Sequence, residues 1–320
     1  MHSKRMAGVG FIMFMGMVLS IAGSCLPVGL AQDKAASSPT ARQRQVIVTI
    51  TDTPGRYVTG LHKDQITILD NNMPQEVVNF EESSFPVSIG LLFNVSKGRY
   101  ADLLAPTRKA FFKDFGVAEK VNEYFIMGFN MDAYFATDWA REPNQLSSGF
   151  DKLASVKPSK NATIYDALVI GIKKVSEGKH SKRALIMISD ANDPGSNSKR
   201  DELLEMLKRN DTLVYAITVR SDVLPFLQSS SNPALERLCS LSGGFARSAK
   251  STAEFLDLME IISLELRHQY LIGFIPSGAE GDWHHLSFEA KTLVLQPSSS
   301  KKIEKVPLFA RSREGYYLNH

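Results

Sequence analysis

Oxygen-bearing side chains follow two apolar stretches of this sequence, at positions that a cation or a polar partner can reach. Asn94 and Ser96 close the stretch VSIGLLFN and its loop, and Asp190 and Asp193 follow RALIMIS. Thr163 comes directly before the segment IYDALVI. Amide, hydroxyl and carboxylate oxygens are the ligands that hard divalent cations such as Mg²⁺ take, with water completing an octahedron. These five residues are therefore candidates for a cation site.

Four of these side chains also have an ordinary structural role open to them. Ser96 and Thr163 are suited to cap the helices that follow them, because a hydroxyl oxygen accepts the free N–H groups of a first helical turn. Asp190 is suited to accept neighbouring backbone N–H groups, and Asp193 to hold the Pro-Gly turn that follows it. It is their shared position, rather than any one residue type, that favours a site.

The sequence offers no other constellation with the spacing that known chemistry needs. It contains no GxSxG elbow, no HExxH zinc motif and no CxxC pair. Segment 178–181 lacks the upstream glycine of a phosphate loop and precedes a strand. His284 and His285 are neighbours on an alternating pattern, so they point to opposite faces and do not chelate one ion. We predict that the protein is not an enzyme; a hydrolase with an unrecognised site is the enzymatic alternative.

Continuous apolar stretches alternate with helical patterns through the middle of the chain. A strand that is apolar throughout is typical of a parallel sheet, because helices cover both of its faces. The expected strands are residues 87–94, 123–130, 183–190, 212–219 and a weaker 244–249. The helical patterns are residues 101–115, 164–175, 198–210 and 232–244, and a capping box at Ser251 and Glu254 opens a final helix. This alternation predicts a doubly wound, mostly parallel α/β sheet with right-handed crossovers.

The predicted fold determines where the candidate residues meet. Ligands of an open parallel sheet bind beyond the carboxyl ends of its strands. Asn94, Ser96 and Asp190 follow such strand ends, and Thr163 precedes a helix that starts at the same edge. We therefore expect these side chains to lie close together at the carboxyl edge of the sheet.

Alternating apolar and polar residues mark β-strands on both sides of the α/β region. Residues 45–82 contain three such patterns, and period two returns after Arg267. Neither end holds enough strands for a stable sheet domain of its own. We therefore expect residues 44–84 and 268–320 to form together one small β-sandwich-like domain, into which an α/β domain of residues 85–267 is inserted.

Three segments of the α/β region resemble the loops of a known metal site. LLFNVSKG, NATIYDAL and IMISDANDPG resemble the metal-ion-dependent adhesion site of von Willebrand factor A (VWA) domains. The pattern of that site is D-x-S-x-S, a Thr before a helix and an Asp that ends a strand. The flanks VIVTITDTPGRYVTGLHKDQITILDNNMPQEVVNFEE and ELRHQYLIGFIP, with a terminal GYY, resemble the VWFA-related domain proteins of acidobacteria. The resemblance extends from residue 45 to residue 317.

The resemblance implies a VWA-like (Rossmann-like) fold and a protein that binds other proteins. It assigns Ser96, Thr163 and Asp190 to the metal site, with Mg²⁺ as the implied cation. It also implies that a bound cation would leave one coordination position for an acidic side chain of the protein partner.

Two positions depart from the family pattern. Asn94 stands in place of the first Asp, and Gly98 in place of the second Ser. Asn94 keeps a carbonyl oxygen but loses a charge, Gly98 supplies no side-chain ligand, and the ammonium of Lys97 lies in the same loop. Asp193 is a further candidate ligand. We therefore predict a degenerate site that binds a cation weakly or binds none.

The beginning of the chain predicts export. Residues 1–31 combine Lys4 and Arg5, an apolar run and small residues before a cleavage point after Ala31, as in a secretory signal peptide. Two alternatives are an uncleaved membrane anchor and lipidation at Cys25, within Ala-Gly-Ser-Cys, a sequence that loosely resembles a lipobox. We expect a periplasmic or secreted protein without a transmembrane segment after cleavage, and a polar linker at residues 32–43.

Composition and cysteine usage narrow the function further. The formal charge of +3 falls to +1 without Lys4 and Arg5, so nothing favours nucleic acid as a partner. After cleavage Cys239 is the one remaining cysteine, and its helical spacing from Leu235 and Leu238 predicts a buried side chain. We predict an exported, non-enzymatic VWA-like module that binds a protein. The alternative is a structural envelope or assembly component with a vestigial metal site.

Overall fold

The computed structural model describes most of the chain from Gln43 onward. The described residues are 43–82, 86–96, 100–159, 161–189, 193, 195–219, 232–277, 281–291, 293–295 and 304–318. The predicted signal peptide, Cys25 and all but the last residue of the predicted linker lie outside them. Residues Ala41–His320 form one compact unit.

A six-stranded, mostly parallel sheet lies in the middle of the described chain, in the order β10-β9-β8-β5-β6-β7. Its parallel strands are β5 (Val87–Asn94), β6 (Glu123–Phe129), β8 (Lys182–Ser189), β9 (Thr212–Val219) and β10 (Ala246–Ala249), and β7 (Ala133–Ala140) runs antiparallel at one edge. Counted from β5 along the chain, this is the strand order of a doubly wound fold, in which the direction of winding switches between β5 and β8.

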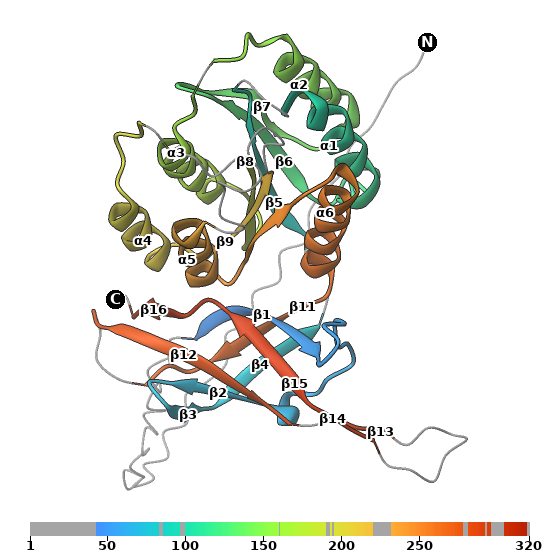
Figure 1. Cartoon of the computed structure of the whole chain (residues 1–320). Coiled ribbons are helices and arrows are strands. Elements are labelled where there is room, and N and C mark those ends of the chain that lie inside the picture. Colours follow the sequence, from blue (N-terminus) through green and yellow to red (C-terminus); the bar gives the residue numbers. More distant parts are fainter. Residues whose placement is uncertain are drawn as a thin grey trace, which may run out of the picture. The chain divides into compact units, whose positions relative to one another are not determined.

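Helices cover both faces of this sheet (Figure 1). One face carries α1 (Tyr100–Asp114), α2 (Pro143–Ser155) and α6 (Thr252–Arg267), and the other carries α3 (Ile164–Ser176), α4 (Arg200–Lys208) and α5 (Pro233–Ser242). Leu91 and Phe93 of β5 pack in the first layer and Leu92 in the second, as the alternation of a strand requires. Every residue of β5, β6 and β9 is buried, and this explains why their sequences are apolar throughout.

The flanking strands form two four-stranded antiparallel sheets among the described residues, in the orders β15-β1-β11-β4 and β16-β12-β2-β3. Their bounds are β1 (Arg44–Asp52), β2 (Ile66–Asp70), β3 (Met73–Gln75), β4 (Val77–Glu82), β11 (Gln269–Phe274), β12 (Trp283–Ala290), β15 (Leu308–Ser312) and β16 (Gly315–Tyr317). A short 3-10 turn (Lys63–Gln65) precedes β2, and β13 (Leu293–Leu295) pairs with β14 (Glu304–Val306). Val48, Ile68, Ile272 and Tyr316 belong to one core that the two sheets share.

A buried polar cluster, the junction cluster, joins the end of α6 to the antiparallel strands. It consists of Glu265, Tyr215, Arg311 and Gln269. Glu265 is 2% exposed, and its carboxylate accepts a hydrogen bond of 2.7 Å from the Tyr215 hydroxyl and pairs with Arg311 at 2.5 Å. Gln269 donates to the Thr49 hydroxyl at 3.0 Å. Polar groups that are removed from water in this way must find partners within the protein, and here the partners come from both kinds of sheet.

The predicted fold class is confirmed, since a doubly wound sheet lies between antiparallel strands from both ends of the described chain. The strands predicted at 87–94 and 212–219 match β5 and β9. The sequence analysis missed the edge strand β7 and the helix α2. Cys239 is 0% exposed, as predicted. The proposed division into domains at residues 85 and 267 stays a prediction.

Candidate functional site

The carboxyl edge of the sheet at the switch between β5 and β8 is the candidate site. β5 and β8 are hydrogen-bonded neighbours, yet the helices that follow them, α1 and α4, pack on opposite faces. Diverging connections leave a crevice at such a point, and α/β proteins bind their ligands there. Asn94 ends β5 and Ser96 follows it, so these two of the predicted residues lie at this switch point.

Asn94 is fully buried, and both ends of its amide are engaged. The Oδ1 atom accepts the backbone N–H of Ser96 at 2.8 Å, and the Nδ2 atom donates to the Ser189 hydroxyl at 3.3 Å. The first bond fixes the loop after β5, and the second ties the end of β5 to the end of β8. Asn94 therefore has a structural role that an aspartate would fill differently, because a carboxylate has no N–H to donate.

Thr163 is held against the end of β6. Its backbone N–H and its hydroxyl both donate to the carbonyl oxygen of Asn130, at 2.8 and 3.1 Å. The preceding carbonyl, that of Phe129, accepts the N–H of Val95 at 2.9 Å. The side chain of Thr163 makes no capping hydrogen bond to α3, so the simple capping role weighed for it does not apply. The structure thus brings together the loops that carry Asn94, Ser96 and Thr163.

Asp193 performs the capping that Thr163 does not. One of its carboxylate oxygens accepts the backbone N–H of Ile164 at 2.8 Å, at the first turn of α3. The Ser196 hydroxyl donates to the same oxygen at 2.7 Å and accepts the N–H groups of Tyr165 and Asp166 at 3.1 and 3.2 Å. A carboxylate at a helix N-terminus is stabilising because the free N–H groups there carry partial positive charge. Asp193 therefore caps the first turn of α3.

Asp166 also holds the loop that contains Asp193 and Ser196. Its carboxylate accepts the backbone N–H groups of Asn197 and Ser198 at 3.0 and 2.8 Å. Partial burial acts to raise the pKa of Asp166, but these hydrogen bonds outweigh it and hold the pKa below the ordinary value. The sequence analysis missed Asp166 and Ser196. The acidic first turn of α3 was the available signal for Asp166.

The described residues offer few ligands for a divalent cation. Ser96 and Thr163 each bring a hydroxyl oxygen and are 5% exposed, but Asn94 directs its oxygen to a backbone N–H. No group of three or more His, Cys, Asp or Glu side chains suited to a metal occurs in the part of the chain that is described. Asp190, Lys97 and Gly98 lie outside that part. The described neutral oxygens alone fit Mg²⁺ poorly, since its protein sites use one or two carboxylates.

An exposed apolar residue has its backbone beside the Thr163 hydroxyl. Met131, in the turn between β6 and β7, is 48% exposed, and its carbonyl oxygen lies 3.4 Å from the Thr163 hydroxyl. A large exposed apolar side chain next to polar loop atoms is a typical contact in protein interfaces, where Met is enriched. The candidate site therefore combines largely buried hydroxyl and amide groups with one exposed apolar residue.

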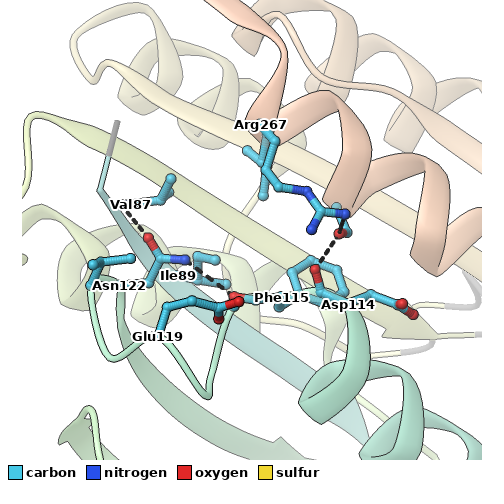
Figure 2. Close-up of a pocket in the computed structure, with 11 residues that line it drawn as sticks. Val87, Ile89, Asp114, Phe115, Glu119, Asn122 and Arg267 are labelled. Carbon is cyan, nitrogen blue, oxygen red and sulfur yellow. Dashed lines mark hydrogen bonds between the residues drawn. The ribbon is translucent and has the colours of Figure 1, made fainter. Parts of the chain in front are cut away.

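A hollow of about 210 Å³ lies at the opposite, amino edge of the sheet (Figure 2). The ends of α1 and α6 and the beginnings of β5 and β6 line it. Figure 2 shows the Asn122 side chain bridging its wall, where it accepts the N–H of Val87 at 2.9 Å and donates to the carbonyl of Phe115 at 3.1 Å. Because this hollow lies at the other edge, it is not part of the candidate site.

A histidine and an aspartate pair inside the antiparallel sheets, which the sequence analysis did not foresee. The Nδ1 atom of His284 lies 2.8 Å from Asp70, and the Tyr316 hydroxyl donates to the same carboxylate at 2.7 Å. His284 and Asp70 are each 1% exposed and Tyr316 is 0% exposed, so a substrate does not reach them. His285 is exposed, which confirms that the two neighbouring histidines point to opposite faces.

Comparison with known proteins is limited to structural likeness. No family model and no curated protein matches the chain. A structure described as von Willebrand factor type A from Catenulispora acidiphila is 6% identical, with 78% of this chain and 72% of that chain covered and a TM-score of 0.46. The vWF domain of the type V pili tip protein Mfa5 from Porphyromonas gingivalis is 10% identical, with 61% and 98% covered and a TM-score of 0.42.

A third structure is proximal thread matrix protein 1 from the mussel byssus, with zinc in its metal-ion-dependent adhesion site (MIDAS) motif. It is 14% identical, with 58% of this chain and 49% of that chain covered and a TM-score of 0.45. This chain thus spans about half the length of the mussel protein. All three TM-scores are below 0.5, so these likenesses carry no argument. The strand order itself shows that the described residues contain a doubly wound, mostly parallel α/β sheet, as the sequence predicts.

Proposed function

We propose that this protein is an exported, non-enzymatic VWA-like module that binds another protein through the carboxyl edge of its six-stranded sheet. The observation that supports the proposal is that the loop after β5 and Thr163 both hydrogen-bond to the chain at the end of β6, where Met131 is 48% exposed. Export is proposed from the predicted signal peptide, with a periplasmic or secreted location and lipid anchoring through Cys25 as a variant. Among the described residues, no helix is long and apolar enough to cross a bilayer.

The surface chemistry supports a protein partner over a small molecule. The described carboxyl edge combines one large exposed apolar side chain with backbone carbonyls and hydroxyls that already hold one another in place. Prearranged loops of this kind bind with little loss of conformational entropy. Met131 is expected to lie at the centre of the contact, with Thr163 at its polar rim.

A matched pair of variants tests this interface. The mature protein carrying Met131→Asp should lose partners that the wild type retains when both are cross-linked and recovered from the envelope fraction. Met73→Asp is the control, because Met73 is 62% exposed on β3, away from the six-stranded sheet. Equal recovery of partners by the Met131→Asp and Met73→Asp variants would contradict binding through the carboxyl edge.

A divalent cation is proposed to contribute weakly to this binding. Ser96, Thr163, Asn94 and Asp190 would hold Mg²⁺, which would offer its remaining position to an acidic side chain of the partner. A carboxylate about 4 Å from a divalent ion gains roughly 8 kcal/mol of gross attraction at an effective dielectric constant near 20. Desolvation offsets most of this gain, and each remaining 1.4 kcal/mol changes affinity about tenfold. Asn94 lacks that carboxylate, which is the reason for the weak binding.

Restoring the family pattern tests the cation role. Asn94→Asp combined with Gly98→Ser should bind Mg²⁺ more tightly than the wild type, seen as a larger rise in melting temperature between EDTA and millimolar Mg²⁺. Ligand at about 100 times its dissociation constant stabilises a protein by about 2.7 kcal/mol. Asn94→Asp alone should melt lower than the wild type in EDTA, because it buries a carboxylate and loses the hydrogen bond to Ser189. An unchanged Mg²⁺ response in the double variant would mean that these loops do not form a cation site.

A second candidate function is a structural envelope or assembly component with a vestigial site. The internal hydrogen bonds of the Asn94 amide favour it, since they use the groups that a ligand would need. Such a component should stay in its assembly in EDTA and with Met131→Asp, whereas the proposed module should lose its partner with that substitution.

A further inference from the structure

A second cavity, of about 230 Å³, lies where the amino ends of β8 and β9 face strands β1 and β11. Its lining residues include the apolar Leu213 and Leu271, the serines Ser181 and Ser242, and the arginines Arg183 and Arg313. Pockets for drug-sized ligands run from about 300 to 1,000 Å³, so this one has room for a smaller molecule. We call this cavity the arginine pocket.

Positive charge exceeds negative charge around the arginine pocket. Asp211 is the acidic residue in its lining, and this carboxylate pairs both with Arg313 and with Arg44, the latter at 2.9 Å. One carboxylate is thus shared between two guanidinium groups, and Arg183 has no share in it. Arg313 is 7% exposed, so bulk water does little to solvate its charge.

Arg183, which is one of the lining residues, has an unused donor. Its Nη2 atom donates to the carbonyl oxygen of Gly178 at 3.2 Å, but its Nε atom is buried and has no hydrogen-bond partner in the described part of the chain. Leaving a buried donor unpaired costs about 1–3 kcal/mol, and more for a charged group. A buried N–H without a partner is therefore a reason to look for a ligand.

The titration of the neighbouring arginines is consistent with a shortage of anions. Burial lowers the pKa of Arg313 to about 9, with repulsion from Arg44 as the second cause. Burial also lowers the pKa of Arg44, although the nearby Tyr316 partly opposes that shift. Cations that are buried without enough negative charge behave in this way, and a bound anion would reverse the shift.

We propose that the arginine pocket binds a small oxyanion, a phosphate or carboxylate group, through Arg183 and Arg313. A guanidinium group presents a planar set of N–H donors that matches these groups, and charge-assisted hydrogen bonds are about twice as strong as neutral ones. The pocket is at the amino edge of the sheet, so it is separate from the site proposed for the protein partner. An oxyanion there would also bridge β8 and β9 to the turn between β15 and β16, which carries Arg313.

Melting curves of the mature protein test the proposal directly. Inorganic phosphate and acetate are each titrated against sodium chloride of equal ionic strength, so that general screening is held constant. At about ten times the dissociation constant, the preferred anion should raise the melting temperature by roughly 2–5 °C above chloride. A response to phosphate alone assigns a phosphate ligand, and a response to acetate assigns a carboxylate ligand. Equal curves in all three salts would overturn the proposal.

Arg183→Gln should abolish the anion response, whereas Arg200→Gln, at an exposed arginine of α4, should leave it intact. Retention of the response in Arg183→Gln would also overturn the proposal. Ser181→Asp provides an independent readout that does not remove an arginine. Its new carboxylate should occupy the pocket, raise the melting temperature in chloride and remove any further gain from the anion. A lowered melting temperature with a preserved anion response would count against the proposed site.

Discussion

The junction cluster gives the sharpest prediction about stability. Glu265 is 2% exposed and holds Arg311 at 2.5 Å, while its other oxygen accepts the Tyr215 hydroxyl at 2.7 Å. In Glu265→Gln the side chain keeps its size and one acceptor oxygen but loses its charge. Arg311 then remains partly buried without a counter-charge, and burial alone acts to lower the pKa of that guanidinium.

The expected loss follows from the burial of the two partners. Removing one member of a fully buried ion pair costs about 3–5 kcal/mol. The Arg311 side chain is 37% exposed, so water compensates part of this loss and about 2–3 kcal/mol is expected. For a chain of this size, such a loss lowers the melting temperature by roughly 4–12 °C.

Urea denaturation of Glu265→Gln, Arg311→Met and the double variant provides the assay. The double variant should be more stable than the sum of the single losses predicts, by about 1–3 kcal/mol, because neither charge is then left alone. Glu142→Gln is the matched control, since Glu142 pairs with Lys120 at 2.6 Å but both side chains are 51% exposed. That surface pair should contribute less than about 1 kcal/mol. Strictly additive losses at residues 265 and 311, or an equal loss at residue 142, would refute the reasoning.

Three further predictions concern single residues. Burial lowers the pKa of Lys182 to about 7, whereas an unfolded lysine titrates near 10.4. Between these two values the unfolded state binds more protons, so the stability of the folded protein rises with pH. In urea titrations between pH 7 and pH 9, the wild type should therefore gain about 2 kcal/mol more stability than Lys182→Met. Asp193→Ala should cost about 1 kcal/mol by uncapping the N–H of Ile164, and Asp193→Asn, which keeps an acceptor oxygen, should recover most of this in thermal melts. Gly90→Ala should cost about 1–3 kcal/mol in the same melts, because its Cβ would lie 2.2 Å from the ring of Phe125; a neutral result would mean that this ring moves freely.

The parallel strands could be predicted because each buried strand corresponds to one continuous apolar stretch of sequence. Every residue of β5 and β9 is buried, so each appears as one uninterrupted apolar run. β7 escaped prediction because it is an edge strand that pairs only with β6, and its exposed and buried positions follow no simple period. α2 did carry a signal, with Pro143 in its first turn and Leu146, Phe150 and Leu153 buried at helical spacing.

The contacts at the candidate site depend on partners that are distant in sequence. Asn94 and Ser189 both stand at strand ends in the sequence, but their hydrogen bond spans 95 positions and becomes visible only when β5 and β8 pair. Likewise, Asp193 reaches the first N–H of α3 from 29 positions away. Residue type and strand order locate such a site, whereas the use of each oxygen depends on tertiary packing.

The pairing of β1 with β15 has a consequence for the order of folding. Val48 of β1 lies opposite Ser312 of β15, so β1 cannot complete its pairing until one of the last strands of the described chain is available. Closing so long a loop is slow unless the intervening chain has already become compact, which shortens the distance between its ends. The six-stranded sheet should therefore form first and bring the two ends together. Until then β1 has unpaired edges, so during synthesis it is a point where proteases, chaperones or neighbouring chains can act.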